Sequence, residues 1–127
     1  MALSADGSTV AIGAPRNSNR SGQVAVYRIN SEGSSWERLG QTIFGNAIDE
    51  GFGNAMDITP DGNTHAIGSS KYVRVFSLEG DSDLGTDNWK QIGQDIIGEL
   101  NLFGCTVSIS TDGKKIAVGA PYSGRVR

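Results

Sequence analysis

Leu3-Ser4-Ala5-Asp6-Gly7 is a short stretch that returns twice along this sequence, as Ile58-Thr59-Pro60-Asp61-Gly62 and as Ile109-Ser110-Thr111-Asp112-Gly113. The second copy begins 55 residues after the first, and the third begins 51 residues after the second. Each copy ends in an Asp-Gly pair beside residues that favour strands, which is the strongest short-range signal for a hairpin turn. The chain is therefore expected to contain three similar hairpins at nearly regular spacing.

Other landmarks keep the same period. Trp36 returns as Trp89, 53 residues later. The other repeated segments are Gly40–Gly45 with Gly93–Gly98, and Phe52-Gly53 with Phe103-Gly104. Self-similarity at a fixed period is the sequence signature of repeat architectures. The sequence therefore predicts a protein built from repeated units of 51 to 55 residues.

Each unit is predicted to contain four short strands and no helix. Runs rich in the β-branched and aromatic residues that strands favour are separated by turn signals. No segment has the 3.6-residue apolar periodicity of a helix over three turns. The first strand of a unit is expected at 52–59 and 103–110, and the second at 9–13, 64–68 and 115–119. The third is expected at 23–29 and 72–78, and the fourth at 36–43 and 89–97.

A repeated, four-stranded antiparallel unit of about 50 residues is the description of a β-propeller blade. We therefore expect an all-β fold of about 2.4 blades, at residues 1–51, 52–102 and, for a partial third blade, 103–127. The chain is expected to begin inside the first strand of one blade and to end inside the third strand of another. Propellers close with roughly four to eight blades. The remaining blades are therefore expected from a longer protein, of which this chain is a fragment, or from self-association.

The second strand of each unit alternates small and large apolar positions. One position holds alanine in every unit and the next holds a large aliphatic residue; these residues are Ala11, Ala66 and Ala117, and Ile12, Ile67 and Val118. Such alternation is expected where the faces of neighbouring blades pack together. His65 takes the position that Val10 and Ile116 fill, and is expected to be a polar residue on a partly buried strand.

Phe103-Gly104 is followed, fifteen residues after its glycine, by Gly119-Ala120-Pro121. This pattern resembles the FG-GAP repeat of integrin-alpha-type propellers. The first unit keeps Gly13-Ala14-Pro15 without a preceding Phe-Gly, and the second keeps Phe52-Gly53 but continues with Gly68-Ser69-Ser70. The resemblance implies a propeller with an adhesion or ligand-binding role, at the cell surface or outside the cell. Blades of that family often bind calcium between their first two strands, but a turn here offers one carboxylate, too few for a calcium site.

No catalytic constellation is found, and the chain is predicted not to be an enzyme. His65 and Cys105 are its only histidine and cysteine, too few for a zinc site or a Cys-His nucleophile. The predicted function is a non-catalytic binding module that presents a propeller rim to a protein or glycan ligand. Two alternatives stay open. Trp89–Gly93 followed by Ile109–Gly113 resembles, more loosely, the tectonin-type lectin propellers, and the chain could also be the non-catalytic portion of a larger propeller enzyme.

The resemblance to propellers implies that the loops between strands 2 and 3, and between strand 4 and the next strand 1, form one ligand-binding rim. Framework residues recur between units while these loops differ, as in a binding scaffold. Asn19-Arg20-Ser21 also matches the N-glycosylation sequon, with Asn19 as acceptor. The candidate ligand-binding residues are Arg16, Asn17, Asn19, Arg20, Asp49, Glu50, Lys71, Asn101 and Tyr122.

Residues 79–87 form an acidic loop that is a weaker candidate for binding Ca²⁺. Asp81, Asp83 and Asp87 lie at relative positions 1, 3 and 7, and alternate carboxylates can converge on a hard cation. The loop lacks a fifth-position ligand and a terminal bidentate glutamate, so a solvated acidic hairpin is favoured and no cofactor is predicted. Trp36 and Trp89 are expected to pack the outer strand of each blade rather than to stack on a sugar.

Composition argues against two classes of partner. The 127 residues are 37% hydrophobic and 20% charged, with a net charge of −3. No Lys/Arg stripe indicates nucleic-acid binding, and no apolar run approaches the ~20 residues of a membrane helix. The first residues carry no signal peptide, so the extracellular or cell-surface assignment depends on the resemblance. Eighteen glycines, roughly twice the ~7% average, fit frequent tight turns.

Overall fold

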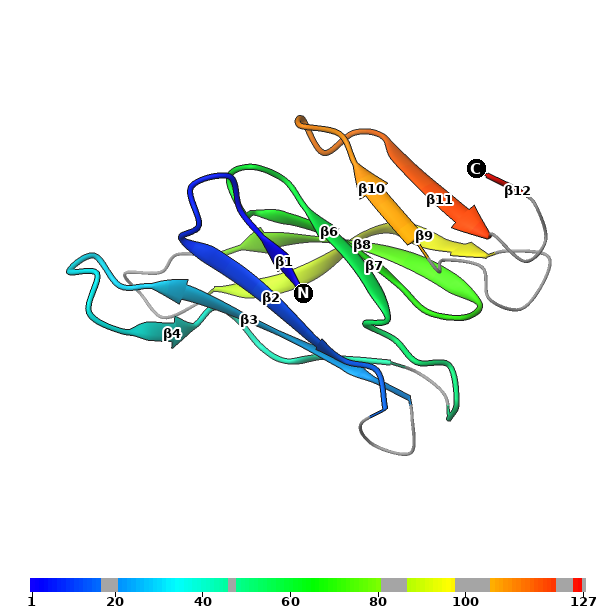
Figure 1. Cartoon of the computed structure of the whole chain (residues 1–127), viewed down its shortest axis with the longest axis horizontal. Coiled ribbons are helices and arrows are strands. Elements are labelled where there is room, and N and C mark those ends of the chain that lie inside the picture. The colour runs from blue at the N-terminus through cyan, green and yellow to red at the C-terminus, as the bar shows by residue number, and fades with distance from the viewer. Residues whose placement is uncertain (17–20, 46–47, 81–86, 98–105, 121–124, 127) are drawn as a thin grey trace.

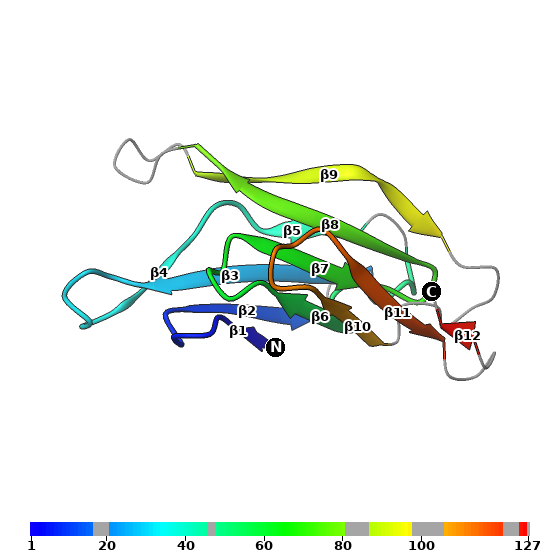
Figure 2. The same ribbon diagram turned by 90° about the horizontal axis from the view of Figure 1, so that it is seen from above.

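The computed structural model describes residues 1–16, 21–45, 48–80, 87–97, 106–120 and 125–126. Within these ranges the chain forms three antiparallel sheets and no helix, which confirms the all-β expectation. Each Asp-Gly pair lies in a hairpin between two paired strands, as predicted. Figure 1 shows the second sheet between the first, at the left, and the third, at the upper right, and Figure 2 gives the same arrangement from above.

Strands that are consecutive in the chain pair with each other in each sheet, except that β5 pairs with β3 instead of β4. The first sheet contains β1 (Ala2–Leu3), β2 (Thr9–Ala14), β3 (Gln23–Ile29), β4 (Trp36–Arg38) and β5 (Ile43–Phe44). The second contains β6 (Ala55–Ile58), β7 (Thr64–Gly68), β8 (Tyr72–Glu79) and β9 (Asn88–Ile97), and the third contains β10 (Thr106–Ile109), β11 (Ile116–Ala120) and β12 (Arg125–Val126).

The outer strand of the first sheet differs from the prediction of a single strand over residues 36–43. It is divided into β4 and β5, which both pair with β3, so the first sheet has five strands. Gly40 lies between them with a φ of 72°, a left-handed conformation that breaks the ladder. At the equivalent Gly93, where φ is 71°, β9 remains one strand but its pairing with β8 shifts register between Val73 and Val75. Both sheets therefore bulge at the same glycine of the repeat.

The three Asp-Gly hairpins share one hydrogen-bond pattern. In the second hairpin the Thr59 hydroxyl donates to Asp61 Oδ1 (2.7 Å) and accepts from the amide of Thr64 (3.2 Å). Asp61 Oδ1 also accepts from the amide of Asn63 (2.9 Å). With serine in place of threonine, the same three bonds recur in the other hairpins at 2.6 to 3.0 Å. The sequence Ser/Thr-x-Asp-Gly therefore specifies the turn.

These bonds lower the pKa of the turn carboxyls, because hydrogen bonds donated to a carboxylate favour its charged form. The pKa of Asp6 falls to about 2, mainly because the Ser8 amide and hydroxyl donate to it. The pKa of Asp61 is lowered chiefly by the amide of Asn63, and that of Asp112 by the hydroxyl of Ser110. All three carboxylates are therefore ionised at neutral pH.

Neighbouring sheets pack face to face through two apolar clusters. The larger cluster joins the first sheet to the second, and the smaller joins the second to the third. The larger contains Ala11, Val24, Val26, Leu39, Ile43, Phe52, Ile67, Tyr72, Phe76 and Trp89. The smaller contains Val73 and Val118, with Ile96, Val107 and Ile116 packed against them. Each pair of neighbouring sheets is thus stabilised by apolar side chains buried between them.

Gly62→Ala is expected to destabilise the chain more than Gly7→Ala. Both glycines have left-handed φ values, 77° and 74°, where an L residue costs about 1–2 kcal/mol. A Cβ on Gly62 would also lie 2.9 Å from the Cβ of Thr9 in the first sheet, whereas a Cβ on Gly7 would meet nothing within 4 Å. We expect losses of about 1 kcal/mol for Gly7→Ala and about 2–3 kcal/mol for Gly62→Ala in urea unfolding. Equal losses would contradict the close packing of the second turn on the first sheet.

Candidate functional site

The described residues of the predicted rim lie at one end of the sheets, opposite the Asp-Gly turns (Figure 1). Arg16, Asp49 and Lys71 are exposed, and Glu50 is half-buried. They belong to three loops, which connect β2 to β3, β5 to β6, and β7 to β8. The structure therefore gathers charged side chains of both signs at this end.

Backbone hydrogen bonds tie these loops together. The amide of Ser70, beside Lys71, donates to the carbonyl of Glu50 (2.8 Å), and the amide of Phe52 donates to the carbonyl of Ser21 (3.1 Å). Gly22 and Phe52 also form an isolated parallel bridge. Phe52 itself is fully buried, so the loop carrying Asp49 and Glu50 is anchored in the core immediately beyond its charged residues.

A partly buried ion pair between Arg74 and Asp95 lies next to these loops. Arg74, on β8, is 7% exposed, and its Nε and Nη2 donate to the two carboxylate oxygens of Asp95 at 2.7 and 2.9 Å. Its guanidinium carbon lies 4.2 Å from the ring centroid of Tyr72 and 6.0 Å from that of Phe52. The hydrogen bonds between the partners raise the pKa of Arg74 and lower that of Asp95. Asp95 reaches Arg74 because the bulge at Gly93 places extra residues of β9 opposite it.

Several predicted site residues lie outside the described part of the chain. They are Asn17, Asn19, Arg20, Asn101 and Tyr122 of the rim, and Asp81 and Asp83 of the acidic loop. Asp87 is described and lies directly before β9. Among the described residues, no group of three or more His, Cys, Asp or Glu side chains is placed to hold a metal ion.

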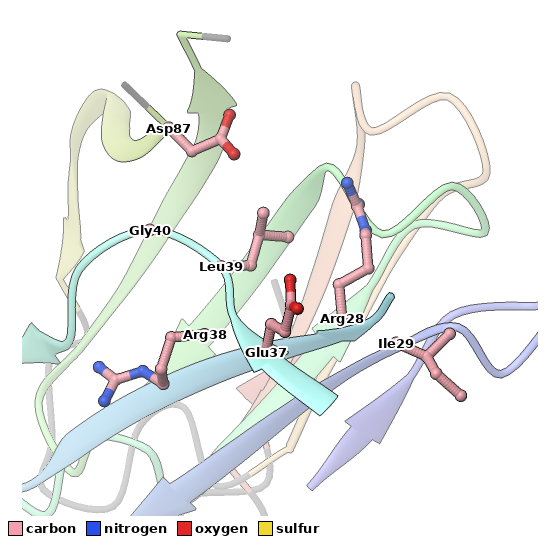
Figure 3. A pocket seen from close by; sticks show the side chains of 7 residues that line it. All are labelled: Arg28, Ile29, Glu37, Arg38, Leu39, Gly40 and Asp87. Atoms are coloured by element: carbon pink, nitrogen blue, oxygen red, sulfur yellow. The ribbon is translucent and has the colours of Figure 1, made fainter. Parts of the chain in front are cut away.

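A pocket that the sequence analysis missed opens at the other end, between the first sheet and the start of β9. Its volume is about 390 Å³, and it is lined by Arg28, Ile29, Glu37, Arg38, Leu39, Gly40 and Asp87. Figure 3 shows Arg28 and Glu37 rising side by side from β3 and β4, with Asp87 across from them and Arg38 pointing away. The pairing of Arg28 with Glu37 in the ladder accounts for their common face.

Arg28 is held in place by two bonds that span the sheets. Its Nε donates to Thr9 Oγ1 (2.9 Å) in the same sheet, and its Nη2 donates to Asn63 Oδ1 (3.0 Å) in the second hairpin. Arginine carries five N–H donors, so these bonds fix the guanidinium beside the pocket without using all of them. The alternation along β3 could have predicted that Arg28 faces the second sheet. Arg28 continues the alternate positions of Val24 and Val26, which face that sheet.

His65 and Trp89 contact each other on the face of the second sheet that packs on the first, and the strand that carries His65 is almost wholly buried rather than partly buried as expected. His65 is fully buried, its Nε2 lies 3.1 Å from the carbonyl oxygen of Gly62, and its ring centroid lies 4.4 Å from that of Trp89. Burial lowers the pKa of His65 to about 4, so the ring is neutral at pH 7. Trp89 is 3% exposed, as expected for a packing residue, but its counterpart Trp36 is 48% exposed.

No protein-family model matches this sequence, and no curated protein matches it either. The described residues include no helix that could cross a membrane.

Proposed function

We propose that this chain is part of a β-propeller of the FG-GAP type and serves as a non-catalytic module that binds a protein ligand at the cell surface. The observation that carries the proposal is the contrast between the two ends of the sheets. The Asp-Gly hairpins at one end repeat the same hydrogen bonds three times. The loops at the opposite end present exposed charge on Arg16, Asp49 and Lys71.

The character of the charged end favours a protein ligand over a glycan. Arg16, Lys71 and Asp49 are exposed there. Of the described aromatic residues at the same end, Phe52 and Tyr72 are 0% and 6% exposed, whereas Phe44 at the end of β5 is 57% exposed. Exposed charges of both signs suit electrostatic complementarity with another protein surface, which gives specificity and fast association. The exposed charges support the protein ligand, and the exposed ring of Phe44 keeps the lectin alternative open.

The described residues also favour binding over catalysis. His65 is buried between the sheets with a lowered pKa and contacts Trp89 and a backbone carbonyl. A general acid or base has to reach a substrate proton within hydrogen-bond distance, and this ring has no exposed edge. The pocket at Arg28 holds arginine and carboxylate side chains but no nucleophile beside a base. Catalytic residues of a larger enzyme would have to come from elsewhere.

Lys71→Glu is expected to weaken binding of the fluorescently labelled chain to intact cells by roughly tenfold, or about 1.4 kcal/mol. The matched control is Lys114→Glu, the same change on an exposed lysine of the third Asp-Gly turn, at the opposite end of the sheets. Binding should fall with added salt, and it should be lost after the cells are treated with protease but not after their glycans are removed.

Three results would overturn the proposal: no saturable binding to any cell type, equal losses for Lys71→Glu and Lys114→Glu, or loss of binding on glycan removal alone. The last result would support the lectin alternative. Arg16→Glu provides a second variant on a neighbouring loop of the charged end, should Lys71→Glu alter folding.

A further inference from the structure

The pocket between the first sheet and the start of β9 is lined by charges of both signs. Arg28 and Glu37 rise side by side, Asp87 lies across from them, and Arg38 points away (Figure 3). One positive and two negative side chains therefore surround the space. Its volume of about 390 Å³ lies within the range of roughly 300–1,000 Å³ that is usual for ligand pockets. The pocket is thus large enough to take a small molecule.

Arg28 retains one edge of its guanidinium for a ligand. Its Nε donates to Thr9 Oγ1 and its Nη2 to Asn63 Oδ1, at 2.9 and 3.0 Å. These bonds occupy the Nε–Nη2 edge, and among the described residues no acceptor meets Nη1. Three of the five N–H donors of the side chain remain, enough for the Nη1–Nη2 edge to bind a carboxylate bidentately. The guanidinium is therefore fixed in position and still able to bind an anionic group.

Glu37 lies beside Arg28, and no ion pair joins these two described residues. They are direct partners in the ladder, so their side chains share a face, with Cβ atoms roughly 5 Å apart. The oxygens that bind Arg28 are neutral, and Glu37 is exposed. The pair therefore presents a cationic donor and an anionic acceptor next to each other, a spacing that suits opposite charges carried on one carbon atom.

The sheet can form without this charge pair. The ladder positions equivalent to Arg28 and Glu37 in the second sheet hold Ser77 and Lys90, which pair in the same way. A hydroxyl there replaces the guanidinium, and an ammonium replaces the carboxylate. The arrangement of charges at the pocket is therefore a property of the first sheet and not of the repeat.

The wall formed by Leu39 and Gly40 is held against the second sheet. Leu39 is 5% exposed, and its carbonyl accepts a hydrogen bond from Trp89 Nε1 (2.8 Å). Gly40 has a left-handed φ of 72°, and a Cβ at this position would lie 2.8 Å from the Trp89 ring. Because this wall is already packed, a ligand would lose little affinity to ordering of the pocket.

We propose that this pocket binds a free α-amino acid with a cationic side chain, such as lysine. Its α-carboxylate binds the open edge of Arg28, its α-ammonium lies at Glu37, and its side-chain cation points toward Asp87. A simple anion would face two carboxylates and a simple cation would face the guanidinium, and like charges placed together are unfavourable. An amino acid with one negative and two positive charges complements all three side chains. The inference does not depend on the proposed protein ligand, because the pocket lies at the opposite end of the sheets from the charged loops.

Three small molecules test which charges the pocket recognises, by NMR titration of the isotope-labelled full chain at neutral pH and constant ionic strength. L-Lysine is expected to bind with a dissociation constant in the millimolar range and to shift the amide signals of Glu37, Gly40 and Asp87. Cadaverine lacks the carboxylate of lysine, and ε-aminocaproate lacks its α-ammonium. Each should bind roughly tenfold more weakly than L-lysine, because each loses one charge-assisted contact.

Two variants assign these contacts to side chains. Arg28→Gln should weaken L-lysine binding roughly tenfold and strengthen cadaverine binding, because the guanidinium attracts the carboxylate and repels amines. Glu37→Gln should weaken L-lysine binding but strengthen the binding of acetate, from which it removes a repelling charge. Glu37 is exposed, so this variant keeps the proposal testable should Arg28→Gln alter folding. Arg16→Gln, at the opposite end of the sheets, is the matched control and should bind L-lysine like the wild type.

Three outcomes would overturn the proposal. The first is the absence of saturable shifts with L-lysine. The second is cadaverine binding as tight as that of L-lysine, which would indicate an acidic surface that attracts any amine. The third is an affinity for L-lysine that changes no more in Arg28→Gln and Glu37→Gln than in Arg16→Gln. None of these results bears on the binding of the chain to cells through Lys71, so the two proposals can fail separately.

Discussion

Trp89→Ala is expected to lower the free energy of unfolding by about 3–5 kcal/mol, the usual cost of removing a buried tryptophan. Its indole is 3% exposed, contacts the His65 ring and donates to the carbonyl of Leu39 in the neighbouring sheet. Truncation would therefore open a cavity between two sheets and leave a buried carbonyl without its partner. Urea denaturation of dilute protein, followed by circular dichroism, measures the loss.

Trp36→Ala is the matched control, because Trp36 occupies the same place in its own sheet. Trp36 pairs with Ile29 as Trp89 pairs with Leu78, but Trp36 is 48% exposed. We expect its replacement to change stability by no more than about 0.5 kcal/mol, as is usual for surface positions. Similar losses for the two variants would contradict the packing described for Trp89. Trp89→Phe, which keeps much of the ring, should recover most of the loss apart from about 1 kcal/mol for the hydrogen bond.

The contrast between the tryptophans marks the limit of what the repeat could predict. The period located both residues, all three hairpins and the strands on either side, because these features follow from local residue patterns. Burial is a property of the neighbouring sheet, and the sequence around Trp36 contains nothing to reveal that its outer face is uncovered. The repeat therefore predicted correctly that both tryptophans lie at the same place in their sheets. It predicted burial correctly for Trp89 but not for Trp36.

Residues that do not repeat were the hardest to predict. Arg74 aligns with Ala25, and its ion pair with Asp95 depends on a bulge at Gly93 that brings the two residues together across the sheet. The pocket at Arg28 likewise combines residues from β3, β4 and the start of β9. A sequence period shows only what the copies share. It therefore does not predict features that occur in one copy and combine segments far apart in the chain.

His65 is expected to make the stability of the chain fall as the pH is lowered from about 6.5 to 4. The residue is 0% exposed, and burial lowers its pKa from 6.5 to about 4. Between these values the unfolded chain binds a proton that the folded chain does not, so unfolding becomes more favourable as the pH falls. The full stability is present above pH 6.5. One pKa unit corresponds to about 1.4 kcal/mol, so the loss amounts to about 3 kcal/mol once the pH reaches 4.

The geometry around the ring agrees with this direction. His65 Nδ1 is buried without a hydrogen-bond partner, Nε2 faces only the Gly62 carbonyl, and the nearby positive charge of Arg28 also lowers the pKa. The carboxyls of the Asp-Gly turns affect stability in a separate, lower pH range. Their folded pKa values lie below the ordinary 3.8, so their contribution is retained above that value and lost only as the pH falls further.

His65→Val distinguishes the pH range in which the histidine titrates from the lower range in which the turn carboxyls titrate. Valine fills the equivalent position in the first sheet, at Val10, and isoleucine fills it in the third, at Ile116, so an aliphatic side chain suits the slot. Urea unfolding at half-unit steps from pH 8 to 3 should show that this variant keeps a nearly constant stability down to about pH 4. Below that, both proteins should lose stability together as the carboxyls of the turns take up protons. If the wild type and His65→Val lose stability in parallel between pH 6.5 and 4, the histidine is not the titrating group. That result would contradict the description of His65 as a buried, neutral ring.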